Sequence, residues 1–395
     1  MNITIHPGRL RGAVRVPASK SAAHRALIAA ALADGLTTLH LNALNDDIEA
    51  TIDALMALGA MIDYDPRRGL LAVRPIESAP NLSRTLECLS GKAAAAMDYS
   101  RLLDIDCGES GSTLRFLLPV ACALGVKARF TGRGRLPQRP NGALVSALRA
   151  HGATIDADTL PMRADGPLNG GVWRLPGDVS SQYVTGLLFA LPLLKADSEI
   201  ALTTPLQSAG YVDMTLETLS DFGIRAEATG AGWRVPGGQA YRSPEDVYVE
   251  GVSRRTAQGD RAVVDLLGQP VIDAAQVPDL VPALAATAAA LDQRTVITGA
   301  ARLRLKESDR LAAVSDMIRA LGGRAAATDD GLVIDGGPIR GGTVDGRNDH
   351  RIVMAAAILA TVAEGPVTVT DSEAVAKSYP EFFEHFAALG GKVDV

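Results

Sequence analysis

Two cations stand at the start of a predicted helix in the stretch PASKSAAHRAL. Lys20 and Arg25 follow Ser19, a residue type that caps helices, and the Ala- and Leu-rich run behind them predicts a helix. The amino end of a helix carries about half a positive charge, so it stabilises acids rather than bases. Two cations at this end indicate either solvated side chains or a site for an anion.

Cations recur at the starts of other predicted helices, beside Ser, Thr and Gly. Helix starts bind anions through exposed backbone N–H groups and the helix dipole. A single Lys or Arg in a first turn is usually only solvated, but repetition at equivalent places predicts a cleft for a substrate with several phosphates or carboxylates. The cations are Lys20, Arg25, Arg115, Arg139, Lys306, Arg310, Arg351 and Lys377.

The acids near these helix starts suggest proton transfer. Asp279 stands among the apolar residues Val277, Leu280 and Val281, and such a setting can tune a carboxylate to act as an acid or base. Asp47 is interpreted only as an acid that favours a helix start. The chain contains no Walker loop, dinucleotide fingerprint or Ser-His-Asp order. These residues predict a polyanion-binding enzyme with acid–base chemistry and without a metal or nucleotide cofactor.

Composition excludes several classes of protein. The chain has 395 residues, of which 47% are hydrophobic and 4% aromatic, and its net charge is -6. The acidic charge and the scarcity of aromatic residues disfavour a nucleic-acid partner, and no apolar run is long enough to predict a membrane span. Three cysteines without a C-x-x-C pair disfavour a disulfide framework or zinc site. A cytoplasmic protein is expected.

A repeated unit must position the candidate residues. Six predicted helices end near a Gly that precedes a short strand, and five more apolar helices alternate with them. The pattern predicts a βαβαββ unit that occurs six times, with the fourth copy incomplete around 250–275, and two bodies of three units with a ligand cleft between them. The helix-ending glycines are Gly59, Gly152, Gly223, Gly268, Gly322 and Gly390.

Eight motifs in order resemble the 3-phosphoshikimate 1-carboxyvinyltransferases (5-enolpyruvylshikimate-3-phosphate synthases) of the enolpyruvyl transferase family. They are PASKSAAHRAL, GSTLRFLLP, LPQRPNGALVSALRAHGA, VSSQYVTGLL, VPDLVPALA, RLKESDRL, NDHRIVMA and AKSYPEFF. The resemblance implies an α/β fold, a two-lobed inverse α/β barrel. Residues 1–18 with 246–395 would form lobe 1 and residues 19–245 lobe 2, with the active site in the cleft between the lobes.

The resemblance also implies an activity. The enolpyruvyl group of phosphoenolpyruvate would be transferred to the 5-hydroxyl of shikimate 3-phosphate by addition and elimination, with release of phosphate, in aromatic amino acid biosynthesis. No cofactor is implied, the partners are the two small substrates, and a monomer is expected. Lys20 and Glu307 are both candidates for protonating the methylene carbon of phosphoenolpyruvate.

Site residues follow from the motifs that match. The resemblance makes Asp279 the acceptor of the hydroxyl proton and adds Lys20, Lys306 and Glu307 to the catalytic group. Shikimate 3-phosphate would contact Lys20, Ser21, Arg25, Ser180, Ser181, Gln182, Ser208, Asp279 and Lys306. Phosphoenolpyruvate would contact Lys20, Gly111, Arg139, Gln182, Arg310, Arg351 and Lys377. His24 stands where many relatives carry Asn, a change expected to have little effect.

Two alternatives stay open. UDP-N-acetylglucosamine 1-carboxyvinyltransferase shares the fold and donor, but it normally carries a Cys in the loop that matches TGRGRLPQRPNG, and this loop has none. A catalytically impaired polyanion-binding relative would follow from decay of the fourth repeat. The presence of Asp279, Lys306 and Glu307 argues against that second alternative, because binding alone would not require them.

Overall fold

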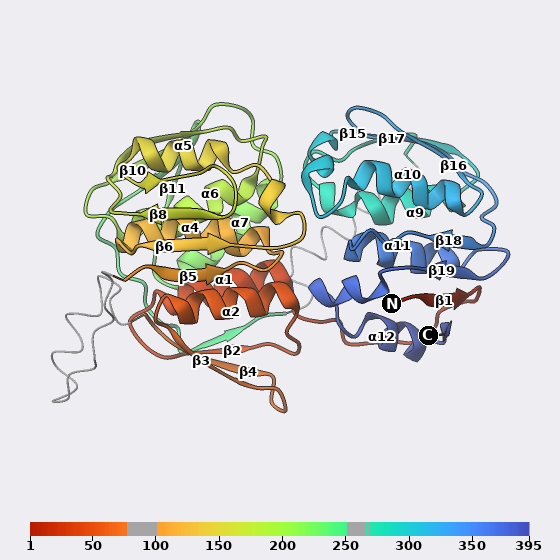
Figure 1. Ribbon diagram of the computed structural model, residues 1–395, viewed down its shortest axis with the longest axis horizontal. Coiled ribbons are helices and arrows are strands. Elements are labelled where there is room, and N and C mark those ends of the chain that lie inside the picture. The colour runs from red at the N-terminus through yellow and green to blue at the C-terminus, as the bar shows by residue number, and fades with distance from the viewer. Residues whose placement is uncertain (77–100, 251–265, 267–268, 395) are drawn as a thin grey trace. The chain divides into compact units, whose positions relative to one another are not determined.

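The computed structural model describes residues 1–76, 101–250, 266 and 269–394 (Figure 1). The chain divides into two compact units: unit 1 is Met1–Pro17 with Gly251–Val395, and unit 2 is Ala18–Glu250. These divisions lie one and five residues from the sequence-based boundaries. The larger difference arises because β13 (Asp246–Tyr248) pairs with β2 (Thr37–His40) and so belongs to unit 2.

Unit 2 is built from three copies of a βαβαββ repeat, with η1 (Leu136–Gln138) and η2 (Leu191–Leu193) as short 3₁₀ turns. The first copy consists of β13, α1 (Lys20–Ala31), β2, α2 (Asp46–Ala57), β3 (Met61–Asp65) and β4 (Leu70–Arg74). The second copy consists of β5 (Leu103–Asp106), α4 (Gly111–Leu124), β6 (Ala128–Thr131), α5 (Gly142–Ala150), β7 (Thr154–Ile155) and β8 (Met162–Asp165). The third copy consists of β9 (Gly171–Leu175), α6 (Ser181–Ala190), β10 (Ser198–Leu202), α7 (Ala209–Asp221), β11 (Glu227–Thr229) and β12 (Gly232–Val235).

Unit 1 contains two copies of the same repeat within its described residues, with three 3₁₀ turns, η3 (Pro278–Leu280), η4 (Ala301–Leu305) and η5 (Ser372–Lys377). Most of the predicted incomplete fourth repeat falls on 251–265 and 267–268, outside the described residues. One copy consists of β14 (Val271–Asp273), α9 (Val281–Ala290), β15 (Arg294–Thr298), α10 (Arg310–Ala320), β16 (Arg324–Ala327) and β17 (Leu332–Asp335). The other consists of β18 (Gly342–Val344), α11 (His350–Ala360), β19 (Val367–Val369), α12 (Phe382–Ala388), β20 (Lys392–Asp394) and β1 (Ile3–His6).

All five described sheets share one topology. In each, the first strand pairs in parallel with the second, the second pairs antiparallel with the last, and the last pairs antiparallel with the third. Two sheets are completed by distant chain segments, because β1 closes the final repeat between β19 and β20, and β13 closes the first beside β2. The predicted βαβαββ unit is therefore confirmed in these five copies.

Glycine ends the second helix of every described repeat. Gly59, Gly152, Gly223, Gly322 and Gly390 all have positive φ, from 75° to 108°, which is the left-handed conformation that closes a helix without a Cβ penalty. At Gly59 the next amide, Ala60 N, donates to Leu55 O at 3.0 Å, so the turn also satisfies a carbonyl at the helix end. The sixth predicted glycine, Gly268, lies outside the described residues.

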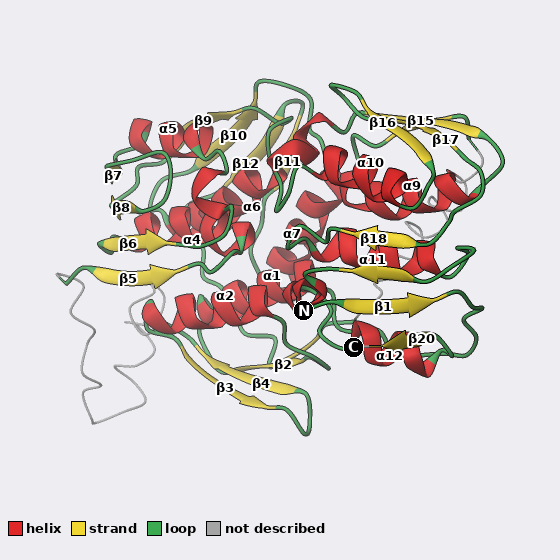
Figure 2. Cartoon of the chain, turned by 45° about the vertical axis from the view of Figure 1, so that its right-hand side comes forward, coloured by secondary structure: helices red, strands yellow, loops and turns green. Residues whose placement is uncertain are grey.

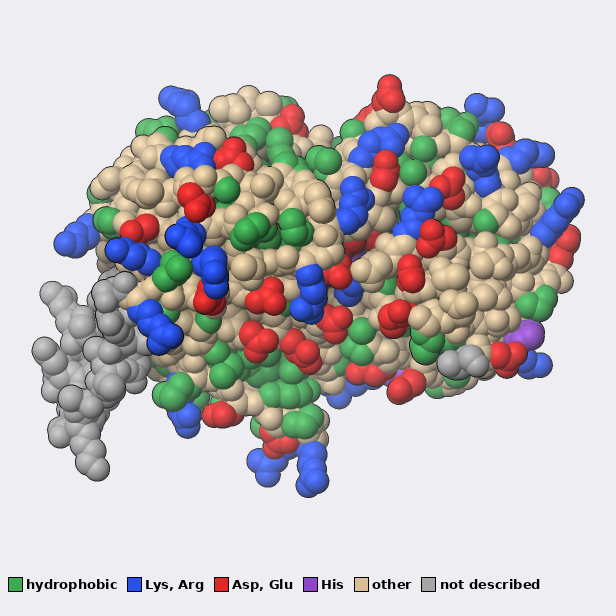
Figure 3. Space-filling model, in the orientation of Figure 1, with side chains coloured by type: hydrophobic (Ala, Val, Ile, Leu, Met, Phe, Trp, Pro, Cys, Tyr) green, Lys and Arg blue, Asp and Glu red, His purple; other side chains and the backbone are tan. Residues whose placement is uncertain are grey.

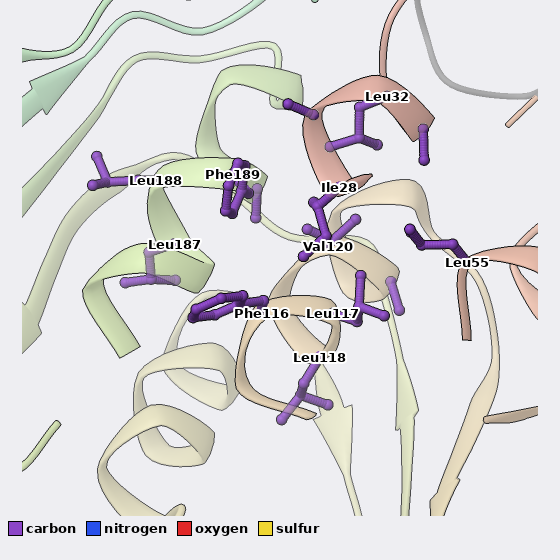
Figure 4. Packing of buried hydrophobic residues seen from close by; sticks show 14 of the residues in the cluster. Ile28, Leu32, Leu55, Phe116, Leu117, Leu118, Val120, Leu187, Leu188 and Phe189 are labelled. Atoms are coloured by element: carbon purple, nitrogen blue, oxygen red, sulfur yellow. The ribbon is translucent and has the colours of Figure 1, made fainter. Parts of the chain in front are cut away.

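The first helices of the repeats form the core of each unit. In unit 2, α1, α4 and α6 are buried over most of their surfaces, as their nearly continuous apolar sequences predict, and Figure 2 shows strands on the outside of the unit. Side chains such as Ile28, Phe116 and Phe189 from these three helices pack together in one cluster (Figure 4). A second cluster, around α9 and α11, forms the core of unit 1.

Candidate active site

In unit 2, polar residues around the starts of α1, α2, α4 and α6 form a cluster that is separate from the hydrophobic core and is called the unit 2 cluster. Lys20 is the first residue of α1, and its Nζ lies 2.7 Å from Asp47 Oδ2 in the first turn of α2. Both side chains are largely buried, at 19% and 11% exposed. The interpretation of Asp47 as only a helix-start acid was incomplete, because Asp47 also balances the cation at the positive pole of α1.

Arg25 differs from the expected position. It lies in the second turn of α1 rather than at its start, and it is 2% exposed. Its guanidinium donates to Thr185 of α6 and Thr215 of α7. Arg25 therefore links three helices, and its charge lies inside unit 2 rather than in solvent.

A hydrogen-bonded chain joins α4 to α6. Arg115 Nη1 donates to Gln182 Oε1 at 2.7 Å, and Gln182 Nε2 donates to Ser112 Oγ at 2.9 Å. The Ser180 hydroxyl caps α6 by accepting from Gln182 N at 3.3 Å. Ser112 was not among the sequence-based candidates, and only its position beside Gly111 could have indicated a role. These hydrogen bonds orient the Gln182 amide, a predicted contact of both substrates.

Besides Ser180, three serines predicted to bind shikimate 3-phosphate lie at helix starts. Ser21 is the second residue of α1, and Ser181, which is buried, begins α6. Ser208 precedes α7, is 3% exposed and has a φ of 57°, a left-handed conformation that is uncommon outside glycine. The structure therefore places all three where backbone N–H groups and hydroxyls can serve an anion.

Arg139 lies over Gly111. It follows η1, three residues before α5, and not at a helix start. A Cβ placed on Gly111 would come within 2.8 Å of both Arg139 Nη1 and Arg139 Nη2. The missing side chain of Gly111 thus makes room for the guanidinium at the start of α4.

We predict that Gly111→Ala weakens binding of phosphoenolpyruvate, the substrate that the resemblance assigns to Gly111 and Arg139, while the fold is kept. The new methyl group displaces the flexible end of Arg139 rather than backbone atoms, so little stability is lost. Loss of a charge-assisted hydrogen bond corresponds to an increase in KM for phosphoenolpyruvate of about 10- to 100-fold. Steady-state kinetics would measure this change. Gly230→Ala is the control, since its Cβ meets nothing within 4 Å, and equal KM values for the two variants would contradict the prediction.

The unit 1 cluster is centred on Asp279, in η3. Its carboxylate lies 3.0 Å from Arg310 Nη1, 3.6 Å from Lys306 Nζ and 3.5 Å from Arg351 Nη2. The expectation of an apolar setting for Asp279 was wrong, because segments distant in sequence bring three cations to this side chain. Nearby cations favour the ionised carboxylate, the form that can accept a proton.

Arg310 is the most enclosed cation of the unit 1 cluster. It begins α10 and is 1% exposed. Its Nε donates to Asp349 Oδ2 at 2.8 Å, and its Nη2 donates to Glu307 Oε2 at 2.7 Å. Burial alone would lower the pKa of Arg310, but Asp349, Glu307 and Asp279 together raise it. The side chain is therefore held as a permanent cation.

Asp349 supports this arrangement from the start of α11. It is fully buried, caps the helix by accepting from Arg351 N, and accepts from the Ser308 hydroxyl at 2.8 Å. Burial would raise the pKa of Asp349, but Arg310 more than offsets this effect and the pKa is lowered. Asp349 stands in the motif NDHRIVMA but was not among the candidate site residues.

Lys377 contacts the same region through a backbone carbonyl. It ends η5, five residues before α12, instead of starting a helix, and it is 7% exposed. Its Nζ donates to Asn348 O at 2.7 Å, one residue before Asp349. The structure therefore brings Asp279, Lys306, Glu307, Arg310, Arg351 and Lys377 together in unit 1. Lys306, like Lys377, does not start a helix as predicted, because it follows η4 and lies four residues before α10.

The buried cations contrast with the protein surface. On the face shown in Figure 3, Lys and Arg side chains are interspersed with Asp and Glu side chains. In the part of the chain that the structure describes, no group of three or more His, Cys, Asp or Glu residues could hold a metal ion. Within the same residues, no helix combines the length and the apolar character needed to cross a membrane.

We predict that His24 makes unit 2 less stable as the pH falls below about 6.5. His24 is 1% exposed, and burial, Lys20 and Arg25 lower its pKa well below 6.5. Between the lowered pKa and 6.5 the unfolded chain binds the proton and the folded chain does not, so stability rises with pH in this window. The slope approaches about 1.4 kcal/mol per pH unit.

The measurement is urea denaturation between pH 5 and 7, comparing the unsubstituted chain with His24→Asn. The variant should lose this part of the pH dependence, while His6→Asn, at an exposed position, should keep it. Parallel stability curves for the unsubstituted chain and His24→Asn would rule out the prediction.

Comparison with known proteins decides the family. The family model for EPSP synthase (3-phosphoshikimate 1-carboxyvinyltransferase) matches residues 5–257 and 255–386. The chain belongs to the EPSP synthase family. A 3-phosphoshikimate 1-carboxyvinyltransferase of Clostridium botulinum (strain Alaska E43 / Type E3) is 37% identical, over 98% of this chain and 97% of the relative. One of Halobacterium salinarum (strain ATCC 29341 / DSM 671 / R1) is 37% identical over the full length of both.

Solved structures share the family fold. An EPSP synthase from Acinetobacter baumannii superposes with a TM-score of 0.76 at 24% identity, and it covers the whole of both chains. The enolpyruvyl transferase NikO from Streptomyces tendae superposes with a TM-score of 0.73 at 19% identity, covering 100% of this chain and 98% of NikO. The predicted α/β fold of the enolpyruvyl transferases is therefore confirmed. Membership of the EPSP synthase family also favours phosphoshikimate over the UDP-N-acetylglucosamine alternative.

The same comparisons bear on the incomplete repeat. The two matches to the EPSP synthase family model meet at 255–257, inside the segment where the sequence pattern lacks part of a repeat. The alignment with the Clostridium botulinum relative spans 437 positions against 395 residues here, so at least 42 positions have no residue of this chain. This chain therefore lacks residues that the Clostridium botulinum relative has.

Proposed function

We propose that this chain transfers the enolpyruvyl group of phosphoenolpyruvate to the 5-hydroxyl of shikimate 3-phosphate. The hydroxyl oxygen adds to the substituted carbon of phosphoenolpyruvate, while the methylene carbon gains a proton. Loss of that proton and of phosphate from the tetrahedral adduct then gives 5-enolpyruvylshikimate 3-phosphate. The single observation that carries this proposal is the Asp279 carboxylate, held among Arg310, Lys306 and Arg351 in a chain of this family.

Unit 1 supplies the proton acceptor in this proposal. Asp279 takes the proton of the 5-hydroxyl, and Lys306 lies beside the same oxygen. Arg310, Arg351 and Lys377 bind the carboxylate and phosphate of phosphoenolpyruvate, for which guanidinium forks and an ammonium point charge are both suited. Their present carboxylate and carbonyl partners occupy donors that substrate oxygens would take over.

Unit 2 binds the rest of the two substrates. Lys20, Ser21, Arg25, Ser180, Ser181, Gln182 and Ser208 contact shikimate 3-phosphate, and Gly111, Arg139, Gln182 and Lys20 contact phosphoenolpyruvate. The buried positions of Arg25 and Arg139 support these roles, because an anion that reaches them is attracted with little screening by water. We further propose that the protein is a cytoplasmic monomer without a cofactor.

Two groups are candidates for protonating the methylene carbon. Lys20 can donate directly, although Asp47 now holds its ammonium. Glu307 accepts from Arg310 Nη2 at 2.7 Å, which favours the ionised carboxylate. Glu307 would therefore have to gain a proton when substrate charge replaces this contact.

The test is the release of phosphate from phosphoenolpyruvate when purified protein is supplied with shikimate 3-phosphate. Release that requires both substrates supports the proposal. A second function, polyanion binding without turnover, is favoured by one observation, the division of the family match into two segments that overlap at 255–257. Retained substrate binding without phosphate release above the blank would select that second function.

A further inference from the structure

Arg25 is held by hydrogen bonds to neutral groups. Its Nε donates to Thr215 Oγ1 at 2.8 Å, and its Nη1 donates to Ser21 O at 2.6 Å. Its Nη2 donates to Thr185 Oγ1 at 3.3 Å and to Tyr211 O at 2.8 Å. Four of the five N–H groups of the guanidinium are thus engaged, which leaves one on Nη1 for a ligand oxygen.

The charge of Arg25 has no carboxylate partner among the described residues. Burying such a cation costs free energy, because hydrogen bonds to hydroxyls and carbonyls replace only part of its hydration. This desolvation lowers the pKa of Arg25 to about 10. A further favourable contact would offset part of this cost and help to hold the guanidinium in place until an anion arrives.

Two aromatic rings supply that contact. The Arg25 Cζ lies 5.2 Å from the centre of the Phe116 ring and 6.0 Å from that of Tyr211. The negative face of an aromatic ring attracts a cation, most strongly where water is excluded. Phe116 is the nearer ring and is 1% exposed, so its attraction is less screened.

Phe116 is itself fixed by its neighbours. It lies in α4 and packs against Phe189 of α6, with ring centres 6.1 Å apart, and it forms a T-shaped pair with the His24 ring, with ring centres 6.4 Å apart. Figure 4 shows Phe116 and Phe189 within the same buried cluster. A ring held this firmly can define where the guanidinium sits.

We propose that Phe116 is a positioning residue for the binding of shikimate 3-phosphate, because its ring face holds Arg25 with one N–H directed to the anionic substrate. This inference rests on the proposed function, which makes Arg25 a contact of that substrate. It adds an apolar residue of α4 to the determinants of acceptor affinity. Phe116 touches no substrate and takes no part in the proton transfers.

The first test is Phe116→Leu, which keeps an apolar side chain but removes the ring face. Calorimetric titration with shikimate 3-phosphate alone should show Kd raised about 5- to 30-fold, with kcat changed by less than about threefold. Phe189→Leu is the matched control: it removes a ring from the same cluster that does not lie over Arg25. Equal Kd values for the two variants would overturn the proposal.

A second test keeps the shape of the ring. Phenylalanines with one, two and three ring fluorines at position 116 weaken the negative face stepwise while steric packing stays nearly constant. Kd should then rise with each fluorine at position 116 and stay constant for the same series at position 189. A flat series at position 116 would refute the role of the ring face, even if Phe116→Leu failed to fold.

The unsubstituted chain separates the two proposals. If it releases phosphate but the fluorinated series is flat, only the positioning role of Phe116 fails. If it neither releases phosphate nor binds shikimate 3-phosphate, the proposed function itself fails.

Discussion

Asp279→Ala should lower kcat by at least about 100-fold, the size of effect expected when a general base is removed. Arg310, Lys306 and Arg351 surround the carboxylate and keep it ionised, so in the proposed reaction it is ready to accept the 5-hydroxyl proton. Asp279→Asn should show a similar loss, because an amide of the same shape cannot accept that proton. Initial rates of phosphate release at saturating substrates would measure both variants.

Binding measurements distinguish the loss of a base from the loss of a site. Both variants should still bind phosphoenolpyruvate, since the cations of unit 1 remain. Asp292→Asn, on the turn after α9, is the control and should keep the unsubstituted rate. A wild-type rate for Asp279→Asn would exclude Asp279 as the proton acceptor.

Asp349→Ala should lower the free energy of unfolding of unit 1 by about 3–5 kcal/mol, as expected when one partner of a buried ion pair is removed. The change leaves Arg310 at 1% exposure without its bidentate partner and also removes the cap of α11. Urea denaturation followed by amide hydrogen exchange in α10 and α11 would measure the loss.

An exposed ion pair provides the control. Asp316 lies 2.6 Å from Arg347 Nη2 and is 48% exposed, so Asp316→Ala should cost less than about 1 kcal/mol. Asp349→Asn retains the size of the side chain and separates the effect of charge from that of the cavity. If Asp349→Ala and Asp316→Ala lowered the free energy of unfolding by similar amounts, the buried ion pair would contribute no more to stability than an exposed one.

Much of the site could be predicted from local sequence. Lys20, Arg310 and Arg351 were expected at helix starts, and the structure places them in the first two residues of α1, α10 and α11. These signals are local, because caps and apolar periodicity act over one or two helical turns. Arg139 and Lys377 were displaced from helix starts because short 3₁₀ turns, which hydrophobic periodicity does not reveal, precede α5 and α12.

The environment of Asp279 illustrates why the rest could not be predicted. Its neighbours in sequence are apolar, but its neighbours in space are cations from positions 306, 310 and 351. A carboxylate's electrostatic setting depends on groups within a few ångströms, whatever their separation along the chain. The wrong expectation therefore came from treating sequence neighbours as spatial neighbours.

Local sequence patterns were sufficient to predict the repeated βαβαββ unit, the glycine-terminated helices and the family, because these depend on hydrophobic period, backbone conformation and ordered motifs. The pairing of the charges, in contrast, depends on how the folded chain brings distant residues together. Lys20 meets Asp47 across 27 residues, Arg310 meets Asp349 across 39, and Arg25 meets Thr215 across 190. Such contacts form when helices that are distant in sequence pack together, and no local pattern encodes them.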